Sequence, residues 1–112
     1  MLMNMYSVYD KVTQVYGPIL LEVNDNSLKR NCKTMILNEL KAQNPSLEGF
    51  IARKSDLVVY KKGTFDTSSG ELLSTGEVQV FTVVELVDEV QSEVSAKIVK
   101  MNEVKNERKD SQ

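Results

Sequence analysis

One stretch constrains the fold more than any other, and it runs from Asp56 to Gly70 with the sequence DLVVYKKGTFDTSSG. Its first part is rich in β-branched and aromatic residues, which favour a strand. Its last five residues, from Asp66 onward, are turn formers. Asp66 can accept hydrogen bonds from backbone amides in such a turn, and Gly70 can adopt a positive φ because it has no Cβ. The stretch therefore predicts a strand that ends in a tight hairpin turn, with Gly70 at positive φ.

The length of the chain limits what it can contain. A chain of 112 residues with 41% hydrophobic side chains can build one modest core and no separate catalytic domain. The single Cys32 cannot form an internal disulfide, which suits a reducing compartment. The N-terminus has no signal-peptide pattern, and no apolar run is long enough to span a membrane. We therefore expect one domain with a tail, in the cytoplasm, with no membrane partner.

Charge is distributed unevenly along the chain, although the net charge is only −2. Residues 24–41 and 48–70 are mildly basic, whereas residues 71–94 carry six acids and no base. The net charge argues against nucleic-acid binding through bulk positive charge. We expect the basic and acidic segments to serve different partners, and the acidic segment to repel a phosphate backbone.

Two strands are expected near the N-terminus. Tyr6–Asp10 has the aromatic and β-branched composition of a strand, and a second apolar run, Ile19–Val23, follows Pro18. Pro18 has no amide hydrogen to donate. We therefore place it at the first residue of the second strand or on a sheet edge.

The clearest helix signal covers Asn26–Lys41. Asn24–Ser27 provides possible N-cap side chains, and Asn44-Pro45 stops the helix. Apolar residues recur on one face at helical spacing: Leu28, Cys32, Met35, Ile36 and Leu40. We expect this face to be buried, in particular at Cys32, Met35, Ile36 and Leu40. Residues 47–51 can hold a further short turn of helix before the central strand.

Beyond the hairpin, the pattern predicts two more strands and a C-terminal helix. A short strand at Glu71–Leu73, a turn at Ser74–Glu77 and a strand at Val78–Val84 fit the residue order. Apolar residues then recur every three or four positions, at Val87, Val90, Val94, Ile98, Met101 and Val104. Valine has middling helix propensity, so this helix needs tertiary or intermolecular contacts to hold it.

Together these elements predict an α+β fold, with a small antiparallel sheet of four or five strands and one packed amphipathic helix. We expect residues 1–84 to form this domain and residues 85–112 to form an amphipathic helical tail with a frayed end. Sheet edges and the valine-rich helix both need covering, which predicts a homodimer.

Several kinds of chemistry lack the residues they need. The chain has no histidine, which removes the usual neutral-pH general base and the commonest metal ligand. Cys32 lies on the apolar helix face and is expected to be a buried structural thiol. Gly63, Gly70 and Gly76 lie at expected hairpin turns, so they do not form a phosphate-binding loop. We therefore expect no enzyme activity, no cofactor and no metal site.

What remains is a combination of basic and aromatic residues. On a sheet face, such residues can stack single-stranded bases and neutralise phosphates. The alternative is that the aromatic rings fill the core and the lysines keep the surface soluble. The candidate nucleic-acid-binding residues are Tyr9, Lys29, Arg30, Lys33, Arg53, Lys54, Tyr60, Lys61 and Lys62.

Two groups of residues carry a resemblance to a known family. The first is Ser7–Lys11, followed by Tyr16-Gly17-Pro18 and by Asn24-Asp25 at the start of a helix. The second is the order Tyr-x-x-Gly-x-Phe-Asp-x-x-x-Gly at residues 60–70. Over residues 5–73 the chain resembles the small nonstructural protein of gokushoviruses, which are microviruses with circular single-stranded DNA genomes. The tail from Glu85 onward matches nothing in that family.

The resemblance implies a DNA-binding protein that acts in genome replication or packaging in the host cytoplasm. The pI of about 5.2 departs from this expectation. The leading hypothesis is a phage protein that engages single-stranded viral DNA, or the complex that synthesises it. The rival is a protein-interaction module that binds a capsid, scaffold or host replication protein without touching DNA. A small inhibitor of a host enzyme fits the same features as the rival. The basic segments favour the first hypothesis, and the acidic segment favours the rival.

Overall fold

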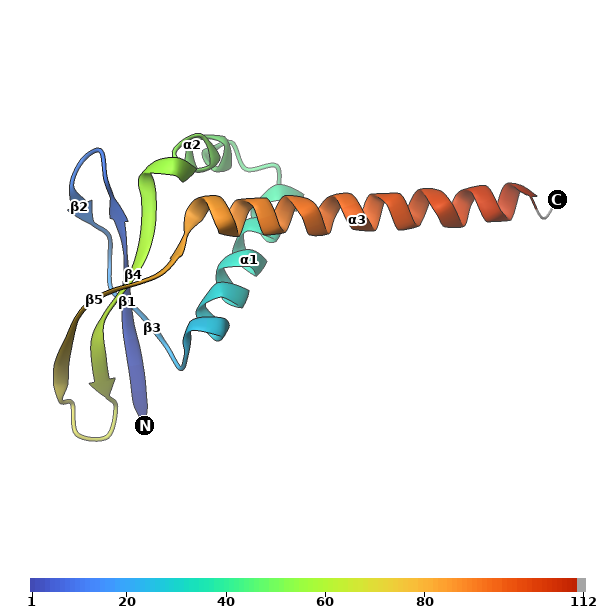
Figure 1. The fold of residues 1–112 in the computed structure, drawn as a ribbon. Coiled ribbons are helices and arrows are strands. Elements are labelled where there is room, and N and C mark those ends of the chain that lie inside the picture. The colour runs from blue at the N-terminus through green and yellow to red at the C-terminus, as the bar shows by residue number, and fades with distance from the viewer. Residues whose placement is uncertain (111–112) are drawn as a thin grey trace.

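A computed structural model describes the backbone of residues 1–110 and the side chains of residues 1–98. Five strands form one antiparallel sheet, and the helices lie to one side of it (Figure 1). The order is β2-β1-β4-β5, with β3 also paired to β1. The strands are β1 (Leu2–Asp10), β2 (Val15–Tyr16), β3 (Leu20–Glu22), β4 (Leu57–Asp66) and β5 (Leu72–Thr82).

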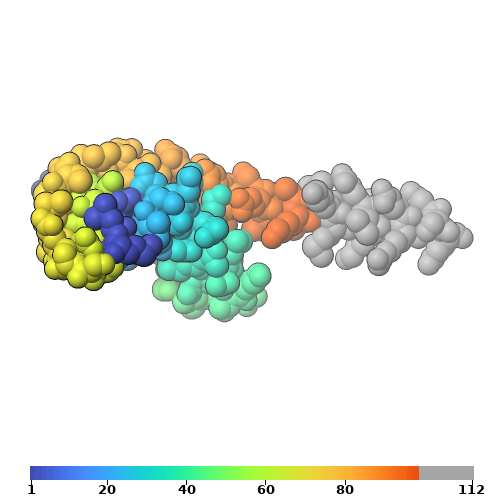
Figure 2. All heavy atoms as spheres, turned by 90° about the horizontal axis from the view of Figure 1, so that it is seen from below, coloured from blue at the N-terminus to red at the C-terminus, as the bar shows by residue number. Residues whose placement is uncertain are grey.

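The helical elements are α1 (Asp25–Lys41), α2 (Ser46–Ala52), the 3₁₀ helix η1 (Lys54–Asp56) and α3 (Val83–Asp110). The predicted α+β class is confirmed. The molecule is elongated, 65 × 33 × 22 Å, because α3 crosses α1 and leads away from the sheet (Figures 1 and 2). Within residues 1–110, no helix is both long and apolar enough to cross a membrane.

The hairpin predicted from Asp56–Gly70 is confirmed. The amide of Asp66 donates to the carbonyl of Glu71 across the turn, at 3.0 Å, and Gly70 has a φ of +75°. The Asp66 carboxylate accepts from the amide of Ser68 at 2.9 Å, as expected for a turn-forming aspartate. The hairpin joins β4 to β5, the two longest strands of the sheet.

The turn predicted at Ser74–Glu77 is wrong, because β5 is one continuous strand through this segment. The register against β4 shifts between the pairs Lys61–Val78 and Gly63–Ser74, so the extra residues form a bulge. Gly76 supplies the positive φ, +74°. A glycine in a polar run serves a bulge as well as a turn, and the sequence alone does not separate the two.

α1 begins as predicted, since the Asn24 side chain accepts from the amide of Ser27 at 2.8 Å. The buried face is narrower than predicted. Ile36 is buried and Cys32 is half-buried, but Met35 is 54% exposed and Leu40 is 40% exposed, so those two predictions are wrong. The reason is that α1 packs against α3 and the short β3, and not across the width of the sheet.

The start of α3 also differs from the prediction. The strand was expected to reach Val84, but it ends at Thr82, whose hydroxyl accepts from the amide of Glu85 at 3.2 Å. Thr82 and Glu85 have the spacing of a capping box, so the sequence did contain this helix start. Leu86, Val87 and Val90 belong to the hydrophobic core, and packing is continuous across the expected boundary between residues 84 and 85. Met101 and Val104 lie outside the described side chains, so their place in the apolar stripe stays a prediction.

Tyr6 anchors α1 to the centre of the sheet. Its ring is fully buried, and its hydroxyl donates to the Asp25 carboxylate at 2.6 Å and accepts from the Asn4 amide at 3.0 Å. Burial and the bond to Asp25 raise the pKa of Tyr6 to about 12. Around this ring the core gathers residues from α1, β4, β5 and α3: Leu28, Ile36, Val59, Phe81 and Val87.

Candidate nucleic-acid interface

Three tyrosine rings gather on the face of the sheet that points away from the helices. Successive side chains of a strand point to opposite faces. Tyr6 points toward the helices, so Tyr9, three residues along β1, points away from them. The ring centroids of Tyr9 and Tyr16 are 4.6 Å apart, and those of Tyr9 and Tyr60 are 6.2 Å apart. Tyr9 and Tyr60 are half-buried and Tyr16 is 42% exposed, so the cluster is accessible from solvent.

Lys62 and Glu77 complete this surface. The Lys62 ammonium lies 4.2 Å from the centroid of the Tyr16 ring, in cation–π geometry. It also donates to the Glu77 carboxylate at 3.0 Å, and the Tyr16 hydroxyl donates to the same carboxylate oxygen. We call the surface formed by Tyr9, Tyr16, Tyr60, Lys62 and Glu77 the tyrosine face.

Strand register brings these residues together. Tyr9 pairs with Tyr16 and Ser7 pairs with Tyr60, so neighbouring strands supply neighbouring rings. The Ser7 hydroxyl donates to the carbonyl of Gly17 at 2.8 Å, which fixes the interruption between β2 and β3. Pro18 lies in that interruption on the sheet edge, as its missing amide hydrogen led us to expect.

A second irregularity separates the two adjacent lysines of β4. The register against β1 steps from Tyr6–Lys61 to Met5–Gly63, which leaves Lys62 as the extra residue of a bulge. Lys62 joins the tyrosine face, whereas Lys61 lies beside Asn4, Asn24 and the start of α1. The two lysines were predicted to act together, but the structure places them at different surfaces.

Gly63 permits the bulge. A Cβ on Gly63 would lie 2.1 Å from the carbonyl oxygen of Leu73, which no side chain can tolerate without a backbone shift. This glycine is therefore required by close packing of β4 against β5, and not by a turn.

The basic residues of α1 lie on the helical side of the molecule. Lys29 pairs with Glu89 at 2.7 Å, and Lys33 pairs with Glu89 at 2.8 Å and with Glu93 at 2.9 Å. Hydrogen bonds from Lys29 and Lys33 hold the pKa of Glu89 below its usual range. Bonds to Glu89 and Glu93 likewise raise the pKa of Lys33. We call this cluster the ionic latch, because it joins α1 to α3.

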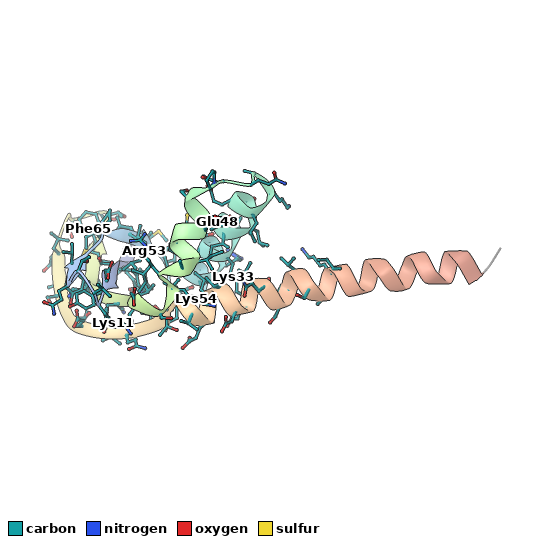
Figure 3. The ribbon with its side chains drawn as sticks, turned by 90° about the horizontal axis from the view of Figure 1, so that it is seen from above. Lys11, Lys33, Glu48, Arg53, Lys54 and Phe65 are labelled. Atoms are coloured by element: carbon teal, nitrogen blue, oxygen red, sulfur yellow. The ribbon has the colours of Figure 1, made fainter. Side chains whose placement is uncertain are left out.

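The other predicted bases are scattered. Lys54 pairs with Asp88 of α3 at 3.5 Å, and Arg53 donates to the carbonyl of Gly49. Figure 3 shows Lys33 and Lys54 near the helices and Phe65 and Lys11 at the sheet, with Arg53 between the two groups. Among the described side chains, Arg30 makes no ion pair. The structure thus brings together Tyr9, Tyr60 and Lys62, and it places the other six candidates elsewhere.

Sequence reasoning missed two members of this surface. Tyr16 is not among the predicted binding residues, although its spacing from Tyr9 fits the two sides of a short hairpin. Glu77 had no local signal, since its position depends on the bulge around Gly76. The acidic segment as a whole was expected to repel phosphate, but four of its acids contact the candidate lysines.

No other chemistry emerges from the described residues. Burial raises the pKa of the Cys32 thiol, which is the opposite of activation as a nucleophile. Within the part of the chain that the structure describes, no group of three or more potential ligands could hold a metal ion.

The fold and this surface define a small α+β protein with an aromatic sheet face. The family model described as Phage ORF5 protein matches residues 3–86. The match covers most of the chain, and the chain therefore belongs to this family of phage proteins. No curated protein and no solved structure matches it.

Proposed function

We propose that this phage protein is a gokushovirus nonstructural protein that binds single-stranded viral DNA on its tyrosine face. It would act in the host cytoplasm during genome replication or packaging, without a catalytic step and without a cofactor. The observation that carries the proposal is the contiguous cluster of Tyr9, Tyr16 and Tyr60, with an ammonium beside it. The family match supports the phage origin, and the resemblance around residues 60–70 supports the DNA partner.

The chemistry of single-stranded DNA suits this surface. Aromatic rings on a sheet stack bases of any sequence, and nearby cations attract the backbone. A duplex hides the flat faces of its bases, so the tyrosine face favours single strands. The proposal does not require strong positive charge, because stacking supplies about 1–3 kcal/mol per base. This removes the conflict with the acidic pI.

The ring contribution is tested with Tyr60→Leu and Tyr60→Phe. Leucine keeps the apolar bulk but cannot stack, so we expect a loss of about 1–3 kcal/mol in affinity for a fluorescent single-stranded oligonucleotide. Phenylalanine keeps the ring and should bind nearly as well as the wild type. Fluorescence anisotropy across a salt series is the measurement. Equal affinity of all three proteins would refute stacking at this position.

The cation is tested with a matched pair of adjacent residues. Lys62→Gln and Lys61→Gln remove the same charge, but only Lys62 lies on the tyrosine face. We expect Lys62→Gln to lower the salt slope by about 0.7, the value for one phosphate contact on a single strand, and Lys61→Gln to leave it unchanged. If both substitutions have the same effect, the charge acts generally and not at this surface.

The rival function is a protein-interaction module, and one observation favours it. Leu40 and Ile98 are large apolar side chains that remain substantially exposed along a groove between α1 and α3. A viral capsid, scaffold or replication protein would suit such a surface. Absence of DNA binding by the wild type at low salt, together with retained folding, would favour this second function.

A further inference from the structure

The Glu77 carboxylate is held by two donors on the tyrosine face. Its Oε1 atom accepts from the Lys62 ammonium at 3.0 Å and from the Tyr16 hydroxyl. The same ammonium lies over the Tyr16 ring, whose centroid is 4.2 Å from Lys62 Nζ. Here an ammonium and a phenol hydroxyl converge on one anionic oxygen. A phosphodiester oxygen can accept hydrogen bonds from the same two donors.

The position of this anion site relative to the rings fits a nucleotide. The Tyr16 ring is tilted by 39° to the adjacent Tyr9 ring, and the Tyr60 ring lies edge-on to Tyr9. A strand whose bases stack on these rings would place its backbone at their rim, where Lys62 and Tyr16 present their donors. The resident carboxylate and an incoming phosphate therefore compete for the same place.

We propose that Lys62 and Tyr16 form a phosphodiester-binding site that Glu77 occupies in the free protein and leaves when single-stranded DNA binds. This inference rests on the proposed function. Glu77 can leave at low cost, because its side chain is 41% exposed and it lies next to Gly76, which has a positive φ, on the edge strand β5. The displaced carboxylate would return to water, so no buried charge is left behind.

The occupied site has a physical consequence for affinity. Lys62 can attract phosphate only after it loses Glu77, so part of its electrostatic gain is spent on breaking an existing ion pair. Glu77 thus acts as a competitor built into the chain, and it weakens DNA binding at low salt. Its removal should strengthen binding, whereas removal of Tyr16 or Lys62 should weaken it.

The test compares Glu77→Gln with Glu48→Gln in anisotropy titrations of a labelled ten-residue oligothymidylate. Glu48 is an exposed acid on α2, on the helical side of the molecule (Figure 3), so both variants gain the same net charge. Glu77→Gln spares binding the loss of one exposed ion pair, which corresponds to roughly 1.4- to 5-fold tighter binding at 0.1 M salt and a smaller gain at 0.5 M, where ion pairs are screened. We expect this gain for Glu77→Gln and little change for Glu48→Gln.

A double variant assigns the gain to Lys62. In a Lys62→Gln background, Glu77→Gln should have no larger effect than Glu48→Gln, because the cation it would release is absent. Thermal unfolding of each variant verifies that it is folded.

The outcomes separate this inference from the proposed function. If the wild type binds with the expected dependence on Tyr60 but Glu77→Gln behaves like Glu48→Gln, the competitor is refuted and the proposed function stands. A gain for Glu77→Gln that persists in the Lys62→Gln background also overturns the inference. If no variant binds DNA at any salt concentration, both proposals fall.

Discussion

On the tyrosine face, the Lys62 ammonium contacts a tyrosine ring and a carboxylate of the same sheet, whereas on the helical side the lysines contact carboxylates of α3. On both surfaces, the basic residues lie beside groups that interact favourably with a positive charge. They differ in what surrounds the ammonium, because Lys62 has an aromatic ring beside its one carboxylate, whereas Lys33 contacts two carboxylates. A sequence that predicts an exposed basic residue therefore does not tell whether that residue is free to bind a ligand or is already paired within the fold.

The ionic latch illustrates this difference. Glu89 and Glu93 are one helical turn apart on α3 and Lys29 and Lys33 are one turn apart on α1, so the two helices align their charges. The segments that look electrically separate in the sequence neutralise one another where they meet. The acids of this segment are therefore better explained as partners of the α1 lysines than as groups that repel DNA.

The largest expected effect lies in the core beneath the helical side. Ile36 is 2% exposed, so Ile36→Ala leaves a cavity and should cost about 2–5 kcal/mol in the free energy of unfolding. Met35→Ala, on the adjacent but exposed position, should change it by less than about 0.5 kcal/mol. Urea unfolding monitored by circular dichroism measures both. Similar losses for the two variants would mean that α1 is rotated from its observed orientation.

The contrast between Met35 and Ile36 shows how far the sequence can lead. Helical spacing identifies the stripe that includes both residues, and the α+β class, the hairpin and the helix start at Asn24 follow from similar local rules. Spacing cannot say how wide a surface the helix will meet. That width depends on α3, which is more than 40 residues away in the sequence, and it decides that Ile36 is covered and Met35 is not.

The same limit applies to the candidate surface. Local composition singles out Tyr9, Tyr60 and Lys62, and the fold brings them together. Local composition cannot distinguish Lys62 from Lys61, because a bulge in β4 places the two side chains on different surfaces. A one-residue change of register reverses which face a side chain occupies, so bulges are where strand patterns fail.

The next prediction concerns self-association on the helical side. The groove between α1 and α3 has a volume of about 350 Å³ and is lined by Leu37, Leu40, Val94 and Ile98, with Lys41 and Lys97 beside them. We propose that α3 of a second copy covers it, since that helix presents apolar residues beside exposed charged ones.

Ile98→Asp tests this homodimer. Ile98 is 53% exposed in the single chain, so completing its burial in a dimer is worth about half of the roughly 1.5–3 kcal/mol that burial of a fully exposed side chain gives. We expect the substitution to shift the protein to monomer in analytical ultracentrifugation, while Ser95→Asp on the same helix has a smaller effect. DNA affinity per monomer should not change, because the tyrosine face lies on the other side of the molecule. A wild type that remains monomeric at high concentration would contradict the prediction.

The smallest expected effect comes from the ionic latch, and it tests the comparison most directly. Lys33→Gln breaks the pairs with Glu89 and Glu93, and exposed pairs contribute about 0.2–1 kcal/mol each. Arg30→Gln is the control, since it removes the same charge from α1 without breaking an ion pair within the described side chains. We expect thermal unfolding to show a loss for Lys33→Gln only, and the loss should shrink in high salt.

Acid should reproduce the effect of Lys33→Gln in the wild type. The latch lowers the pKa of Glu89, so its contribution is complete above the usual glutamate pKa and is lost as pH falls through the lowered value. Lys33→Gln should therefore flatten the decline of stability in this acidic range. Neither Lys33→Gln nor Arg30→Gln should alter the affinity for oligothymidylate or its salt slope. If Arg30→Gln reduces that slope by as much as Lys62→Gln does, the helical side also binds phosphate, and the division between the two surfaces is wrong.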